Sequence, residues 1–255
     1  MIRSRFTRAC CLFSLCYVMA EATPIAMSQI SFNMSNITVN LGFGTGCLLS
    51  TSTYSNVLAD YNGIDVITDE LTDEGTVTAT VSGATASAAV HSGSIANSTH
   101  STISNGAAVA SSAVTSDIYL DVENVDFVSV TMDISTMLDV SVDDPGYEFA
   151  YGALVNWLGL SYFDGVDYEL VNDDMYSLLF DTDIDGLENS SNKTATLTVS
   201  YNFGSNYSGQ LMIENIATTF SETQSHPANV PEPSGITLMV MGLAMLLPLA
   251  VRRKV

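Results

Sequence analysis

The residues whose types and spacing could do chemistry lie in one acidic segment, Asp181-Thr182-Asp183-Ile184-Asp185-Gly186. Carboxylates at its first, third and fifth positions and a glycine at its sixth match the first half of an EF-hand-type calcium loop. The second half departs from that loop, because Asn192 stands where a bidentate glutamate would complete the coordination. The sequence leaves two interpretations open: a calcium-binding turn between strands, formed by Asp181, Asp183 and Asp185, or a solvated acidic turn.

Two other kinds of site have candidate residues. Paired carboxylates, such as Asp143-Asp144 and Asp173-Asp174, could complete a calcium site or serve a secreted hydrolase. Such pairs are weak signals in a chain with 28 Asp and Glu residues. Trp157, the only tryptophan, could form a sugar-stacking surface with the tyrosines and phenylalanine near it. We expect these aromatic residues in the core instead, because Leu and Val are interleaved with them.

The segments that must position these residues are short runs of alternating apolar and polar side chains, which predict β-strands. Period-two alternation is clear in residues 118–122 and 197–203, and further apolar runs predict separate strands over 127–134, 137–142 and 211–216. Turns rich in Gly, Asn and Asp lie between these runs. We predict an all-β chain, with one antiparallel β-sandwich or jelly-roll-like domain. The predicted domain spans residues 23–220.

Residues 76–116 are unusual in composition. Thirty of these 41 residues are Ala, Ser, Thr or Gly and none is charged, so the segment offers few large apolar side chains. Three interpretations compete: tightly stacked strands with small side chains, a linker, or an Ala-rich helix. We favour strands, because the frequent Val and Thr weaken a helix, and because so long a linker inside a domain is uncommon.

The charge of the chain excludes one class of partner. The formal net charge is -21, and Lys193 is the only basic residue between the two ends. Such a surface cannot neutralise phosphates, so we expect no nucleic-acid partner. It attracts cations instead, and it is typical of marine, halophilic or calcium-rich extracellular proteins.

The N-terminus indicates export. Three arginines within the first eight residues precede an apolar run over 9–20 and then small residues. This order predicts a secretory signal peptide over residues 1–22, recognised by the secretion translocon. Cys47 is the only cysteine that remains after its removal, so the domain has no internal disulfide. We expect Cys47 to be a small buried side chain.

The C-terminus has three parts in a fixed order, after a polar spacer predicted over 221–229. The motif comes first, an apolar run over 235–251 follows, and a basic cluster ends the chain. The apolar run predicts a single transmembrane helix, with the basic cluster on the cytoplasmic side and the body outside. The motif and the basic cluster are Val230, Pro231, Glu232, Pro233 and Ser234, and Arg252, Arg253 and Lys254.

This tail, residues 230–255, resembles the PEP-CTERM sorting signal of Gram-negative bacteria. The resemblance implies recognition by an exosortase-type transpeptidase, which cleaves near the motif. It also implies a protein that is first held in the membrane and then reaches the cell surface or the extracellular space. The leading function is accordingly non-enzymatic: a component of the exopolysaccharide or biofilm matrix. The alternatives are a calcium-dependent carbohydrate-binding module and, third, a secreted hydrolase.

Overall fold

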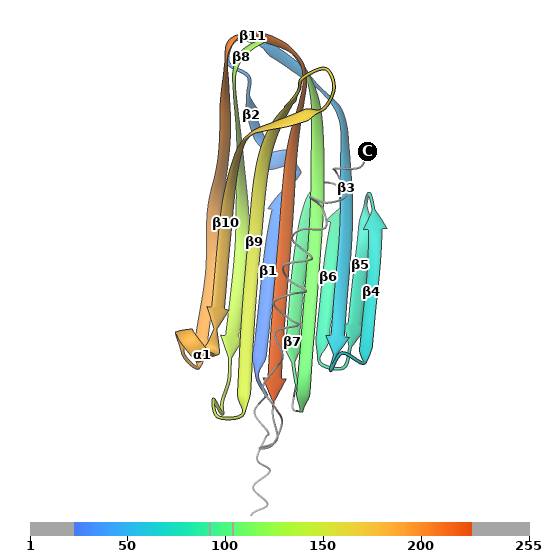
Figure 1. The fold of residues 1–255 in the computed structure, drawn as a ribbon, viewed down its shortest axis with the longest axis vertical. Helices are drawn as coiled ribbons and strands as arrows, with labels where there is room; N and C mark the ends of the chain where they lie inside the picture. The colour runs from blue at the N-terminus through green and yellow to red at the C-terminus, as the bar shows by residue number, and fades with distance from the viewer. Residues whose placement is uncertain (1–22, 92, 104, 226–255) are drawn as a thin grey trace, which may run out of the picture.

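The computed structural model describes residues 23–91, 93–103 and 105–225, and almost all of them lie in antiparallel β-strands (Figure 1). The predicted all-β class is therefore confirmed. The only helical pieces in these three ranges are the 3-10 turn η1 (Met34–Asn36) and the single turn α1 (Thr182–Asp185). None of the helices so described is long or apolar enough to cross a membrane. The predicted signal peptide and sorting tail lie outside the described residues.

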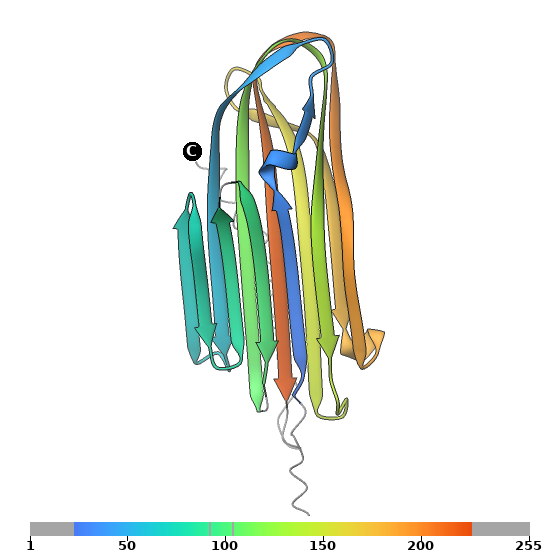
Figure 2. The ribbon, with the colours of Figure 1, turned by 180° about the vertical axis from the view of Figure 1, so that it is seen from behind.

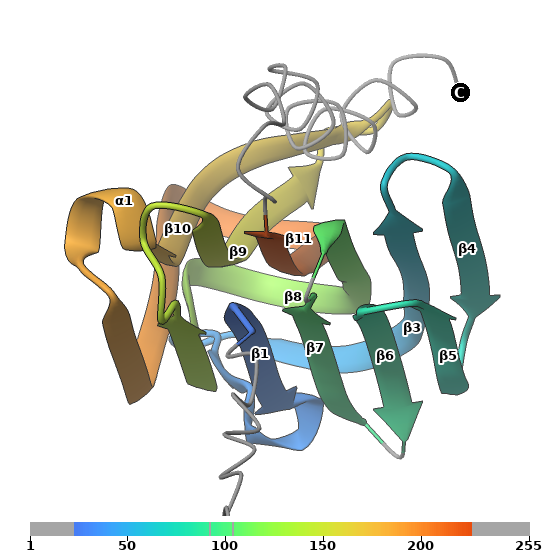
Figure 3. The ribbon, with the colours of Figure 1, turned by 90° about the horizontal axis from the view of Figure 1, so that it is seen from below.

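The strands form two facing layers, and two long strands belong to both (Figure 3). We name the layers after one strand of each. The β1 layer runs β11–β8–β1–β7–β6–β5, and the β3 layer runs β10–β9–β11–β8–β3–β4. The bounds are β1 (Ile25–Asn33), β3 (Thr45–Tyr61), β4 (Asp65–Thr72), β5 (Gly75–Val81), β6 (Ala84–His91), β7 (Ser94–Thr102), β8 (Gly106–Ser141), β9 (Glu148–Phe163), β10 (Tyr168–Asp181) and β11 (Glu188–Ser225).

Strands β8 and β11 pair along nearly their whole lengths and bend over together at the top of the molecule in Figure 1. Their register shifts on both sides of Tyr207, where the two strands pass from one layer to the other. The short strand β2 (Thr38–Asn40) pairs with β8 below this bend, and Figure 2 shows it above the end of β1. Gly44 lets the following loop lie against the bend, because a Cβ there would come 2.4 Å from a side-chain carbon of Val125.

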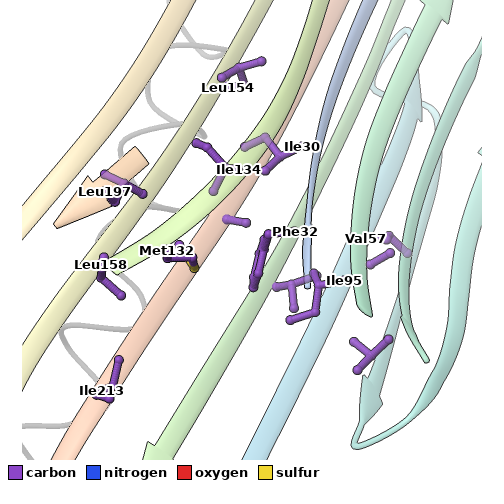
Figure 4. Close-up of a cluster of buried hydrophobic side chains, with 14 of the residues drawn as sticks. Ile30, Phe32, Val57, Ile95, Met132, Ile134, Leu154, Leu158, Leu197 and Ile213 are labelled. Atoms are coloured by element: carbon purple, nitrogen blue, oxygen red, sulfur yellow. The ribbon is translucent and has the colours of Figure 1, made fainter. Parts of the chain in front are cut away.

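The space between the layers contains two different kinds of packing. In one half, large aliphatic side chains from β1, β8, β9 and β11 meet, and Figure 4 shows many of them. Along β1, buried and partly exposed residues alternate over the whole strand, as expected of a half-buried strand. We call this the large-residue half, and its fully buried members include Ile30, Met132, Ile134, Leu138, Leu154, Leu158, Leu160 and Leu197.

The other half is filled mainly by alanine and hydroxyl side chains. It lies between β5, β6 and β7 on one side and β3 and the first part of β8 on the other. We call this the small-residue half, and it includes Ala59, Ala79, Ala84, Ala86, Ala88, Ala108 and Ala110. Of the three interpretations of residues 76–116, tightly stacked strands with small side chains is the one confirmed.

Side chains in and beside the small-residue half form hydrogen bonds directly from layer to layer. The Ser112 hydroxyl donates to the backbone oxygen of Ser87 at 3.1 Å. The Asn97 amide donates to the backbone oxygens of Ser112 at 3.1 Å and Ala217 at 2.9 Å. Short side chains can bond to the opposite backbone only where the two layers approach closely. Ala, Ser and Asn at these positions therefore set a narrower spacing than Leu or Ile would.

Three expectations about boundaries and burial were wrong. The strands predicted separately over 127–134 and 137–142 are one strand, and so are those over 197–203 and 211–216, because β8 and β11 run without a turn. The domain does not end at residue 220. Residues 221–225 are the last, mostly buried, part of β11 and not a polar spacer, since they pair with both β8 and β9. Cys47 is exposed.

Candidate functional site

The acidic turn predicted to bind calcium forms the single-turn helix α1 at the end of β10. Asp181 is its N-cap: one carboxylate oxygen accepts a hydrogen bond from the backbone N–H of Asp183 at 2.9 Å. A carboxylate oxygen of Asp185 accepts from the backbone N–H of Asp181, also at 2.9 Å. Two of the three predicted ligands therefore stabilise the turn itself.

Buried Thr182 fixes this turn to β9, because its hydroxyl accepts from the backbone N–H of Ala150 at 3.0 Å and donates to the Ala150 oxygen at 3.1 Å. The pKa of Asp181 is raised, first by burial and then by the negative charges of Asp183 and Asp185. The backbone hydrogen bond from Asp183 acts in the opposite direction.

The described ranges contain no group of three His, Cys, Asp or Glu side chains arranged to hold a metal ion. The acidic pairs that could have completed a site have other partners. Asp173 accepts a hydrogen bond from Trp157, and Asp174 accepts from the backbone N–H of Thr198 at 2.8 Å. Asp144 accepts from the backbone N–H of Gly146 at 3.2 Å. Calcium binding by Asp181, Asp183 and Asp185 thus stays a prediction, without support from this geometry.

The outer face of the β3 layer carries the aromatic residue with the clearest potential to bind a ligand. Trp157 is partly exposed and lies on the face of β9 opposite the buried Leu158 and Leu160, and not in the core as we expected from the interleaved Leu and Val. Its ring lies across Gly159, where a Cβ would come 2.2 Å from the ring. Its Nε1–H donates to a carboxylate oxygen of Asp173 on the neighbouring strand β10 at 2.9 Å. The hydrogen bond to Asp173 thus holds one edge of the indole against the sheet, and the absence of a side chain at Gly159 leaves room for the ring.

Acidic residues lie in a row beside this indole. Asp173 pairs with Gly159, Gly159 with Glu214, and Glu214 with Asp117, so the row crosses β10, β9, β11 and β8 on the outer face. Glu214 and Asp117 pair directly, so their Cβ atoms are about 5 Å apart, whereas Gly159 separates Asp173 from Glu214. The carboxylates of Glu214 and Asp117 are mostly buried. These oxygens are acceptors suited to hydroxyl or ammonium donors.

Next to Trp157 the same face is apolar over several strands. We call this patch the outer strip: Ala153, Val155 and Trp157 of β9, Ile216 and Phe220 of β11, and Met175 and Leu179 of β10. Met175 and Leu179 are 59% and 50% exposed. The sequence does contain a signal for this strip, because β9 and β11 carry apolar residues at both odd and even positions. A strict period-two pattern would instead place the apolar residues on one face of each strand.

A buried carboxylate borders the outer strip at the end opposite the acidic row. Glu222 lies on β11 beside Tyr151 of β9, which in turn pairs with Asp181. The Gln224 amide donates to Glu222 at 2.5 Å, but burial still raises the pKa of the Glu222 carboxyl. The pKa of Tyr151 is raised as well, first by burial and then by the charges of Asp181 and Glu222.

A cleft of about 430 Å³ opens between the layers near η1. Its walls are mainly apolar and come from Met34, Ile37, Val39, Leu48, Val90 and Ile118, while Asp73 and Glu74 lie at its rim. The backbone N–H of Asp73 donates to the oxygen of Thr53 at 2.9 Å and ties this rim to β3. A cleft of this size is large enough for a small ligand, but no group of catalytic type converges in it.

The remaining predicted site residues lie outside the described part of the chain: Val230, Pro231, Glu232, Pro233, Ser234, Arg252, Arg253 and Lys254. No protein-family model matches the sequence, and no curated protein is significantly similar to it.

Proposed function

We propose that this is an exported, non-enzymatic protein of the extracellular exopolysaccharide or biofilm matrix. The secretion translocon exports it, its C-terminal helix holds it in the membrane, and an exosortase-type transpeptidase processes the tail and frees it to the surface. The order of motif, apolar run and basic cluster supports the route. The single basic residue between the two ends supports an extracytoplasmic location.

The observation that carries the matrix role is the position of Trp157 on the outer face of the β3 layer. A flat indole fixed by Gly159 and Asp173 offers an apolar plane of the kind that stacks on the C–H face of a sugar ring. The carboxylate of Asp173, the exposed member of the adjacent row, accepts hydrogen bonds from sugar hydroxyls. We therefore assign exopolysaccharide as the partner and Trp157 as its first contact.

The test is co-sedimentation of the protein with exopolysaccharide isolated from the producing cells. Trp157→Ala should abolish sedimentation, Trp157→Phe should retain part of it, and Tyr147→Ala, which removes an exposed aromatic side chain elsewhere, should leave it unchanged. Equal sedimentation of all three variants and the native protein would remove this role from Trp157.

The same assay separates the two alternatives. A calcium-dependent carbohydrate-binding module should lose sugar when calcium is chelated, and Asp183→Asn with Asp185→Asn should reproduce that loss. A secreted hydrolase should cleave the polymer, and Asp174→Asn, in one of the acidic pairs, should stop cleavage while binding continues. A matrix component should show neither effect, and deletion of the protein should alter the extracellular material of the cells.

The sorting route has its own test in the producing cell. Replacement of Pro231 and Pro233 by Ala should leave the unprocessed chain in the membrane fraction, while Ser221→Ala, a conservative change upstream of the motif, should not. Release of both variants to the same extent would contradict processing at this motif.

A further inference from the structure

The outer strip is apolar, but its residues differ in exposure: Ala153 and Phe220 are buried, whereas Val155, Trp157 and Ile216 are partly exposed. Met175 and Leu179 are at least half exposed, and Val155 and Ile216 lie beside Trp157 on the same face. The two layers pack against each other through their inner faces. No other described element lies over the outer strip (Figure 3). Contiguous apolar patches of this kind mark docking surfaces.

The dimensions of the strip match one segment of this chain. From the row of Glu222 to the row of Glu214 the strip is eight residues long, which is about 26 Å along a strand. The apolar run over 235–251 has 17 residues and, as the predicted helix, is also about 26 Å long.

The chain leaves the described structure at the correct end to reach the strip. Strand β11 runs through the middle of the outer face and ends at Ser225, which pairs with both β8 and β9. Residues 226–234 then span up to about 30 Å when extended, enough to turn back over the face. The apolar run would lie antiparallel to β11.

Charge favours the same arrangement. A run that starts near Glu222 and lies antiparallel to β11 brings Arg252, Arg253 and Lys254 to the acidic row. That row contains Glu214 and Asp117 on adjacent strands. Outside the predicted signal peptide, these three residues are the only cluster of positive charge in the chain.

We propose that residues 235–251 dock on the outer strip in the exported chain and cover Trp157 until the tail enters the membrane or is removed. The inference rests on the proposed function, because it makes polysaccharide binding wait for sorting. The occupant is the chain's own tail, and the contact is intramolecular.

Trp157 reports on the docking directly, because it is the only tryptophan. The experiment measures acrylamide quenching of the mature full-length chain in detergent-free buffer, and needs no sugar. Leu238→Asp with Leu246→Asp should prevent docking, and should raise the quenching constant at least about twofold as the indole passes from apolar contact to water. Phospholipid vesicles should produce the same rise in the native chain by taking up the tail.

Matched variants test each side of the contact. On the strip, Leu179→Asp replaces a half-exposed side chain and should also raise quenching, while Val166→Asp, at an 89% exposed position outside the strip, should not. In the tail, Ser234→Asp adds one negative charge ahead of the apolar run and should leave quenching low. Circular dichroism checks that every variant keeps the sheet.

Two outcomes would overturn the inference. Equal quenching of the native chain, the tail variant and the vesicle sample would show that the tail does not cover Trp157. Low quenching that disappears on dilution would identify a second copy of the chain as the occupant. Sedimentation of the tail variant with exopolysaccharide is scored separately, so that failure of docking is distinguished from failure of the sugar-binding role.

Discussion

The two halves of the interlayer core are filled by different kinds of side chain. In the large-residue half, Leu158, Met132 and their neighbours fill the space with aliphatic volume. In the small-residue half, Ala86 and Ala110 occupy little volume, and Ser112 and Asn97 form hydrogen bonds directly to the backbone of the opposite layer. The difference shows that a sandwich can close over a segment poor in large apolar side chains, provided that its layers approach more closely there.

The largest effect should come from changing volume in each half. Leu158→Ala should lower the free energy of unfolding by about 2–5 kcal/mol, because it leaves a cavity among large side chains. Ala86→Leu should lower it by about 1–3 kcal/mol, because the closely spaced layers cannot accept the added atoms. Urea denaturation measures both values. Native stability of the Ala86→Leu protein would contradict close spacing.

Replacing a polar residue of the small-residue half should change stability according to whether its side chain has a hydrogen-bond partner. Asn97→Ala should cost about 1–3 kcal/mol, because it removes the two hydrogen bonds that the amide donates and the one that it accepts from Ser112, and leaves buried polar groups behind. Thr99, two residues further along β7, has a buried hydroxyl without a partner among the described residues. Thr99→Val should therefore leave stability unchanged or raise it. The same loss in both variants would mean that packing alone, and not bonding between layers, matters here.

Substitutions in the turn α1, at the edge beside the large-residue half, should change stability less. Asp181→Ala removes the N-cap of α1 and should cost about 1 kcal/mol. Asp183→Ala is the matched control, because no hydrogen bond of its side chain supports the turn, and it should cost less. Thermal unfolding compares the two variants. If calcium at fixed ionic strength raises the midpoint of the native protein but of neither variant, the turn is a cation site after all.

The smallest expected effect on stability is at Glu222, which lies outside both halves. This effect depends on pH. Its pKa in the folded protein is raised above the ordinary value of 4.5, so the folded state keeps its proton more tightly than the unfolded state does. Stability is therefore lost as pH rises from 4.5 through the raised pKa. Glu222→Gln should be more stable than the native protein at pH 7 and equal to it below pH 4.5. A gain that persists at low pH would point to packing and not to charge.

Much of the fold could be predicted from the sequence, for identifiable reasons. Alternation in residues 118–122 and the β-branched residues of 76–81 favour strands, and both segments are strands. Continuity could not be predicted, because Asn124 and Gly204, residue types that usually mark a turn, here lie at the bend where β8 and β11 pass between the layers. The role of 221–225 was missed for a related reason: Ser221 and Thr223 are as polar as a spacer, yet they face the closely spaced core.

The candidate site was harder to predict than the fold. Asp181, Asp183 and Asp185 have the spacing of calcium ligands, but that spacing equally suits a capped helical turn. The Leu and Val residues interleaved with Trp157 favour a core position, but Leu158 and Leu160 are buried on one face of β9 and Trp157 lies on the other. Only the pairing of β9 with β10 brings Asp173 to its Nε1, and no local pattern contains that contact.

The ladder between β8 and β11 has a consequence for the order of events during biogenesis. It pairs Gly106 with Ser225 at one end and Ser141 with Glu188 at the other, so it closes only after nearly the whole body has been synthesised. Contacts between segments so distant in sequence form slowly. If the chain is exported as we propose, it can therefore pass through a narrow pore while still unfolded, and the two layers close only after translocation.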